Sequence, residues 1–291
     1  MKAPHAGRPA HLAERAAAVA GPDVVAAFQR DGAVCLRGLL DAAEVQRLAR
    51  GIDLNLAAPS PRAIVASRPG DPGFFIEDFC NWDNNDAPYG ADYRATAIDT
   101  AVPEVARRLM QSTSVRLYHD HMLTKEPGTR TPTPWHQDQP YYNIDGMQNV
   151  SFWIPVDAVT RASTLEFVAG SHRGPWLMPR TFMDHQAKWF PEGSLAELPD
   201  IEADRGAFPI IGWALEPGDA VAFHMLTLHA AAGVEGTRRR RVFSLRYLGD
   251  DIRHAPRRWK TSPDFPGLAD ELPAGAPMRH ARFPLLIGEE A

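Results

Sequence analysis

A mainly β fold with α-helical additions is the fold class that this sequence predicts, because helical and strand patterns occupy different parts of the chain. Helical apolar spacing is confined to residues 11–112, where loops separate the helices. Short apolar or alternating runs bounded by turn residues follow over 113–250 and are typical of a β-sandwich or barrel. Prolines and glycines recur through 251–291 and predict an irregular segment. We expect residues 1–10 to be a flexible tail and residues 11–291 to form a single domain.

The first elements are expected to be helices around one short strand. Apolar residues three and four apart predict helices over about 11–19 and 22–31, followed by a strand over 33–37. Asp41 is a preferred N-cap residue, so a helix is expected from there to residue 54. Pro103 is suited to open a further helix that ends near residue 111.

Residues 57–95 predict long loops, because they hold several prolines and glycines and the polar run from Asn81 to Asp86. Loops of this length are uncommon in a compact domain unless they are functional. We therefore expect this stretch to cover a substrate site.

Strands dominate the rest of the domain. They are expected over about 114–125, 134–138, 148–156, 164–168, 218–223, 226–231 and 240–248. Residues 174–215 form a long insertion between two of these strands. Its apolar side chains include Trp176, Met178, Phe182, Met183, Trp189 and Phe190. The insertion is either a lid over a site or a satellite hydrophobic cluster beneath a long loop.

Composition is that of an ordinary globular protein. The 291 residues are 44% hydrophobic and 23% charged, and the net charge of −5 gives no general attraction to nucleic acid or to an anionic membrane. Cys35 and Cys80 form no CxxC pair, which is compatible with a reducing compartment. No apolar stretch approaches the ~18 residues of a membrane span, and the N-terminus lacks a signal-peptide core. We therefore expect a cytoplasmic protein without a membrane or nucleic-acid partner.

The segment from Trp135 to Asp138 carries the first candidate site. On an extended strand, residues two apart point to the same side, so His136 and Asp138 can reach one ion while Gln137 faces away. His229 ends an apolar strand downstream and supplies a second imidazole. Two histidines and one carboxylate occupy one face of an octahedron and leave three positions open, which suits non-haem Fe(II) and O2. The alternative is a histidine paired with a neighbouring carboxylate at a strand end.

Arg240 strengthens the first interpretation. Alternation places Arg240, Val242, Ser244 and Arg246 on one face of their strand, and we expect a hairpin from His229 to bring one arginine near the metal. A guanidinium grips a carboxylate through two parallel hydrogen bonds, as a 2-oxo acid would require. The alternative for residues 238–241, four consecutive arginines, is a solvated turn or a phosphate-binding patch.

The motifs together resemble the phytanoyl-CoA dioxygenase family of Fe(II)- and 2-oxoglutarate-dependent oxygenases. The resemblance runs in order from about residue 24 to residue 250. Its matching stretches are 28–34, 125–128, 133–142, 152–157, 165–173, 217–219, 223–229 and the strand of Arg240.

The resemblance implies a double-stranded β-helix, that is, a cupin-like jelly roll. It implies that His136, Asp138 and His229 ligate Fe(II) and that Arg240 binds the distal carboxylate of 2-oxoglutarate. The other residues expected beside the co-substrate are Lys125, His119 and Trp153, and those expected to contact the substrate are His121, Tyr141, Tyr142 and Arg246. Relatives often carry a hydroxyl residue two positions after the distal histidine, but this chain has Ala231 there.

The function expected is hydroxylation of an unactivated C–H bond in a small or medium-sized organic molecule. It would use Fe(II), O2 and 2-oxoglutarate and release succinate and CO2. Asp138 favours hydroxylation over halogenation, because related halogenases lack the carboxylate ligand. The alternatives are desaturation, epoxidation or cyclisation with the same cofactors, or a metal-binding jelly roll without catalytic activity.

Overall fold

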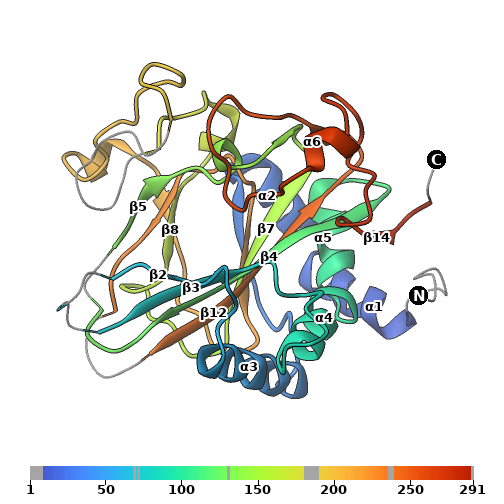
Figure 1. Ribbon diagram of the computed structural model, residues 1–291. Helices are drawn as coiled ribbons and strands as arrows, with labels where there is room; N and C mark the ends of the chain where they lie inside the picture. Colours follow the sequence, from blue (N-terminus) through green and yellow to red (C-terminus); the bar gives the residue numbers. More distant parts are fainter. Residues whose placement is uncertain are drawn as a thin grey trace.

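A computed structural model describes residues 9–67, 70, 73–129, 132–179, 190–234 and 239–289 (Figure 1). The helices are α1 (Ala10–Val19), α2 (Pro22–Asp31), α3 (Ala42–Ala57), α4 (Gly90–Ile98), α5 (Val102–Met110) and α6 (Leu268–Glu271). The strands before residue 150 are β1 (Ala33–Leu36), β2 (Ile64–Val65), β3 (Phe75–Phe79), β4 (Val115–Lys125), β5 (Thr133–His136), β6 (Ile144–Asp145) and β7 (Asn149–Pro155). The later strands are β8 (Leu165–Val168), β9 (Ile210–Ile211), β10 (Ala220–Phe223), β11 (His229–Ala231), β12 (Arg240–Leu248), β13 (Arg253–His254) and β14 (Leu285–Ile287).

Two antiparallel sheets form the body of the molecule. In the larger sheet the strand order is β1-β10-β7-β12-β4-β3-β2, with β14 beside β4. The smaller sheet has the order β5-β11-β8-β9. The chain crosses from one sheet to the other at several connections, such as those from β10 to β11 and from β11 to β12, and side chains of both sheets line one cavity. This arrangement is the predicted jelly roll.

Helices α1 to α5 cover the outer face of the larger sheet, whereas α6 packs in a separate cluster. In β12, Phe243 and Leu245 point outward into a core shared with α1, α3, α4 and α5. The ring of Phe243 stacks on Tyr93 of α4 with the centroids 4.2 Å apart. Because β12 alternates, Arg240 and Arg246 are on the inner face and line the cavity, as predicted.

Local signals explain how the helices begin. Asp41 caps α3 with a complete capping box, since its side chain accepts from the Glu44 amide at 2.9 Å and its own amide donates to the Glu44 carboxylate at 2.8 Å. Proline occupies the first turn of both α2 and α5, as expected from Pro103 in the second case.

The prediction of loops over residues 57–95 is wrong in part. β3 pairs with β4 in the larger sheet, β2 pairs with β3, and α4 begins at Gly90. Glycine and proline on either side of β3 obscured its five-residue alternation, in which Phe75, Glu77 and Phe79 face the cavity. The stretch therefore contributes a wall of the cavity through a strand.

The C-terminal segment is also more regular than expected. It adds the short helix α6 and the strand β14, which pairs with β4 at Arg116. Within the described ranges, no helix is long and apolar enough to cross a membrane.

The insertion 174–215 packs a hydrophobic cluster in its described part. Leu177 and Ile201 are buried against Trp135, Val168 and Leu228. Phe190 packs on Tyr141 and on Trp259, with ring centroids 5.5 Å and 5.0 Å apart. Phe182, Met183 and Trp189 fall outside the described residues, so the lid stays a proposal.

Candidate active site

A cavity of about 140 Å³ lies between the two sheets. The larger sheet contributes β3, β4, β7, β10 and β12 to its lining, and the smaller sheet contributes β5, β8 and β11. Ten of the eleven residues proposed for the site from the sequence line it: Lys125, His121, His136, Asp138, Tyr141, Tyr142, Trp153, His229, Arg240 and Arg246. His119 does not. It is buried behind Tyr142, with the two rings edge to face and their centroids 5.1 Å apart.

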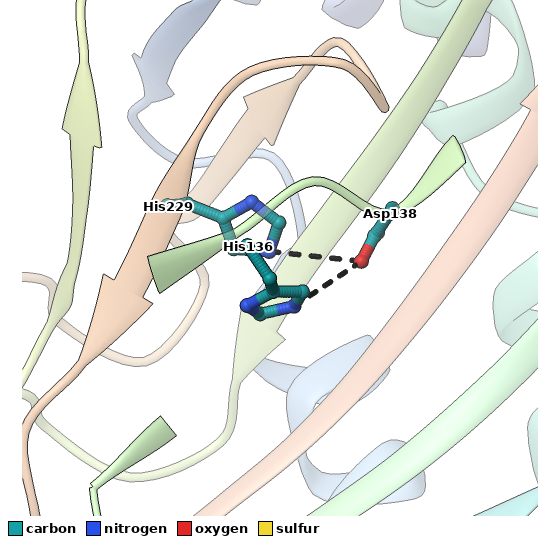
Figure 2. A group of neighbouring side chains, drawn as sticks. All are labelled: His136, Asp138 and His229. Atoms are coloured by element: carbon teal, nitrogen blue, oxygen red, sulfur yellow. Dashed lines mark ion pairs between the residues drawn. The ribbon is translucent and has the colours of Figure 1, made fainter. Parts of the chain in front are cut away.

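His136, Asp138 and His229 form a group that fits one metal ion (Figure 2). One ligand atom from each residue lies within 4.8 Å of the others. The Nε2 atoms of His136 and His229 are 3.6 Å and 3.7 Å from Oδ1 of Asp138. The cross-strand pairing of His136 with His229 explains the closeness of the imidazoles, since it joins β5 to β11 directly at these residues.

Hydrogen bonds outside the group set its orientation. Nδ1 of His136 lies 2.8 Å from the Pro134 carbonyl and Nδ1 of His229 lies 2.8 Å from the Thr227 carbonyl. A donor at Nδ1 leaves the Nε2 lone pair facing the cavity, which is the tautomer that a metal ligand requires. On Asp138, Oδ2 accepts from Ser151 at 3.2 Å and from Arg246 at 3.3 Å, so Oδ1 is directed to the imidazoles.

The protonation states also fit a metal site. Burial alone would raise the pKa of Asp138, but Arg246 and the two imidazoles hold it well below its usual range. Burial, and then the neighbouring His136, lower the pKa of His229 to about 3. The group thus presents a carboxylate and a neutral His229 near pH 7, as metal binding requires.

One part of the strand argument is wrong, although both side chains converge as expected. β5 ends at His136, and Asp138 has helical backbone angles of φ −74° and ψ −44°. The Asp138 amide donates to the Met225 carbonyl at 2.8 Å, which turns the chain inward at this point. Gln137 faces away, as predicted, and its side chain donates to the Leu226 carbonyl at 2.9 Å.

Arg240 and Lys125 are cross-strand partners at the other end of the cavity. Arg240 is buried, donates to the Ser163 carbonyl and lies over the Trp153 ring, with Cζ 5.5 Å from the centroid. Burial lowers the pKa of Arg240 to about 10, and among the described residues no carboxylate pairs with it. Burial, followed by the charge of Arg240, lowers the pKa of Lys125 to about 7, against the opposing effect of Glu77. Two buried cationic side chains side by side fit a ligand carboxylate.

The predicted hairpin from His229 to Arg240 is wrong. β11 pairs with β5 and β8, whereas β12 pairs with β4 and β7 in the other sheet. The chain crosses the cavity between the two strands, so Arg240 reaches the pocket from the opposite wall.

The arginine run does not form a phosphate patch in its described part. Arg239 pairs with Glu126 and Asp53, and Arg241 pairs with Asp53 and Asp157. Arg238 lies outside the described residues.

Arg246 is committed mainly to the metal group. Its Nη2 bonds Asp138, and its Nε donates to the Tyr142 hydroxyl at 3.1 Å. Nη1 of Arg246 and Nε2 of His121 are buried without a hydrogen-bond partner among the described residues. Burial, and then the charge of Arg246, hold the pKa of His121 well below its ordinary value, so the imidazole is neutral.

Sequence reasoning missed several residues that line the cavity or hold a lining residue in place. Glu77 and Phe79 were assigned to a loop, and only their alternation in β3 pointed to a strand. Ser151, which holds Asp138, carries no signal in the sequence alone. Thr133 was missed because an irregularity of β5 turns it toward the cavity.

The fold and the cavity are those of jelly-roll oxygenases that bind a metal with two histidines and one carboxylate. The phytanoyl-CoA dioxygenase (PhyH) family model matches residues 28–242. The chain belongs to the phytanoyl-CoA dioxygenase family.

Individual relatives are more distant. A probable phytanoyl-CoA dioxygenase of Caenorhabditis elegans is 29% identical over 140 residues, which is 46% of this chain and less than half, 43%, of that protein. Among solved structures, the epimerase SnoN in complex with Fe3+, alpha ketoglutarate and nogalamycin RO is 25% identical, with a TM-score of 0.68 over 96% of this chain and 99% of that one. The alpha ketoglutarate dependent carbocyclase SnoK is 20% identical, with a TM-score of 0.67 over 91% and 96% of the two chains, and shows the fold alone.

Proposed function

We propose that this protein is an Fe(II)- and 2-oxoglutarate-dependent dioxygenase that hydroxylates an unactivated C–H bond of a small or medium-sized organic molecule. One observation carries the proposal: the metal-binding group and a buried arginine without a carboxylate partner among the described residues line the same cavity. A site that binds only a metal ion does not require a buried arginine. Family membership and the likeness to SnoN support the same cofactors.

The donor set decides which residues would hold each group. His136, Asp138 and His229 offer two imidazole nitrogens and a carboxylate oxygen, which fits Fe(II) and leaves positions for further ligands. Arg240 and Lys125 would bind the distal carboxylate of 2-oxoglutarate. When bound, iron, 2-oxoglutarate and O2 supply the oxidant, and the balanced reaction converts R–H, 2-oxoglutarate and O2 to R–OH, succinate and CO2.

The protein's own part is to bind, orient and exclude water. Arg246 neutralises Asp138 and fixes its second oxygen, so the carboxylate stays ionised in a buried site. The rings of Phe79 and Tyr141 make the walls beside the metal group apolar. His121 adds a neutral polar group there. These side chains favour a substrate with an apolar body and a polar substituent. Arg246 remains a candidate contact for that substituent through Nη1 alone.

The first experiment measures succinate. Protein purified without oxygen is incubated with Fe(II) and 2-oxoglutarate, and O2 is then admitted. We expect succinate from the wild type and none from Asp138→Ala. The matched control is Asp23→Ala, which removes an exposed aspartate on α2, outside the cavity, and should retain activity. Wild-type protein that neither forms succinate nor binds 2-oxoglutarate would instead favour a metal-binding jelly roll without catalytic activity.

Epimerisation is a second candidate, because the likeness to an epimerase extends over 96% of this chain. The product mass separates the outcomes once a substrate is found. Hydroxylation and epoxidation of an alkene both add one oxygen atom, and the position of that oxygen, determined by NMR, distinguishes them. Desaturation or cyclisation removes two hydrogens, whereas epimerisation leaves the mass unchanged. An unchanged mass with inverted stereochemistry would refute the hydroxylase proposal.

A further inference from the structure

A third hydrogen-bond donor stands at the cationic end of the cavity, on the wall opposite Arg240 and Lys125. Thr133 of β5 lines the cavity, and its Oγ1 lies 3.5 Å from Nζ of Lys125. Lys125 and Arg240 are neighbours across β4 and β12. A hydroxyl, an ammonium and a guanidinium therefore converge from both sheets.

A β-bulge explains why Thr133 faces inward. In β5 and β11, His136 pairs with His229 and Thr133 pairs with Ala231. Three residue steps on β5 thus oppose two on β11, with Pro134 and Trp135 opposite Ala230. Regular alternation would put Thr133 and His136 on opposite faces, but the extra residue brings both to the cavity. Proline suits such a position because it has no N–H to leave unpaired.

The pairing also places Thr133 beside the position where a hydroxyl is missing. Ala231, its cross-strand partner, lines the same cavity and offers no side-chain donor. Directly paired side chains on one face have Cβ atoms about 5 Å apart, so a hydroxyl from either strand reaches the same region. The site therefore keeps a hydroxyl but takes it from the neighbouring strand.

We propose that Thr133 is a co-substrate-binding residue that donates its hydroxyl hydrogen to the distal carboxylate of 2-oxoglutarate. This inference rests on the proposed function. A carboxylate accepts about four hydrogen bonds. The fork of Arg240 supplies up to two, Lys125 supplies one, and Thr133 completes the set. In this role Thr133 distinguishes 2-oxo acids that carry a distal carboxylate from those that lack it.

The test removes the hydroxyl and then returns it from the other strand. The variants are Thr133→Val, Thr133→Ser, Ala231→Ser and the double variant Thr133→Val with Ala231→Ser. The measurement is the Kd of 2-oxoglutarate for the oxygen-free Fe(II) protein, by calorimetric titration. Thr133→Val should raise the Kd about tenfold, the loss of one hydrogen bond to a charged group. Thr133→Ser should stay within a few-fold of wild type, and the double variant should recover most of the loss.

A second ligand separates this role from a structural one. 2-Oxobutyrate has no distal carboxylate, so Thr133→Val should leave its Kd unchanged. Equal weakening of both ligands would mean that the substitution disturbs the pocket as a whole, which overturns the proposal. An unchanged Kd for 2-oxoglutarate in Thr133→Val, or no recovery in the double variant, overturns it as well. Wild-type protein that binds no 2-oxoglutarate would refute the proposed function itself. If the wild type does bind 2-oxoglutarate, a negative result with the variants refutes only the role of the Thr133 hydroxyl.

Discussion

The affinity for 2-oxoglutarate is predicted to fall as the pH rises from 7 to 9, because Lys125 loses its proton in this range when no co-substrate is bound. Burial, followed by the charge of Arg240, lowers the pKa of Lys125 from 10.5 to about 7. A carboxylate beside Nζ favours the ammonium and raises this pKa in the complex. The complex then holds more protons than the free protein above pH 7, so higher pH opposes binding.

The magnitude follows from the two pKa values. If the complex restores Lys125 to its ordinary pKa of 10.5, the free protein must take up a proton to bind. Between pH 7 and pH 9 the Kd should then rise roughly 50-fold. The buried histidines His119 and His229 and the cavity arginine Arg240 change little over this range, since the pKa values of the two histidines are about 3 and that of Arg240 is about 10. Burial raises the pKa of Asp120 to about 7, but this carboxyl accepts from the amides of Asn81 and Trp82 outside the cavity lining.

Calorimetric titration of the Mn(II)-loaded protein in two buffers of different ionisation enthalpy counts the protons directly. At pH 8 we expect uptake of nearly one proton for each 2-oxoglutarate bound. Lys125→Met should abolish this uptake, and 2-oxobutyrate, without a distal carboxylate, should cause little. A pH-independent Kd with no proton uptake by the wild type would show that Lys125 does not meet the carboxylate, and the assignment of this end of the cavity would fail.

Three further perturbations test other parts of the structure. Arg246→Gln removes the charged partner of Asp138. The affinity for Fe(II), measured by competition with a chelator, should therefore fall about 10–100-fold. An unchanged affinity would contradict the role given to Arg246. Lys125→Met removes a side chain that is a buried ammonium at pH 6, below its lowered pKa. At this pH the substitution should raise the Tm of the metal-free protein by about 2–4 °C for each kcal/mol of stability gained. A lower Tm would contradict the view that the buried charge is costly. Asp41→Ala breaks the capping box with Glu44 and should lower the free energy of unfolding in urea by about 1 kcal/mol. An unchanged free energy of unfolding would mean that other contacts stabilise the N-terminus of α3.

The metal group was predictable because few residues determine it. The short spacing of His136 and Asp138 keeps them together in almost any turn or strand, so the predicted grouping of these side chains with His229 is confirmed although β5 ends at His136. The alternation of β12 was predictable for the same reason, since period two follows from strand geometry alone. These inferences needed no knowledge of which strands pair.

The predictions that failed concern features that depend on strand pairing, which the local sequence does not determine. β3 lies between turn-forming residues, and its place beside β4 comes from pairing with residues more than 40 positions further along the chain. The bulge in β5 becomes visible only when β11 lies beside it. The hairpin to Arg240 was inferred from proximity in sequence, whereas this jelly roll places the consecutive strands β11 and β12 in opposite sheets.

The choice between the two inward arginines of β12 also depends on the structure. Arg240 and Arg246 are equivalent by alternation, six residues and so about 20 Å apart along the strand. Arg246 lies 3.3 Å from Asp138, and that pair cancels its charge. At the other end, Glu77 partly offsets Lys125, whereas within the described lining no carboxylate offsets Arg240. A buried guanidinium without an opposing charge is costly unless a ligand supplies one. The charge balance therefore supports our proposal that Arg240, and not Arg246, binds the co-substrate, since Arg246 already pairs with Asp138.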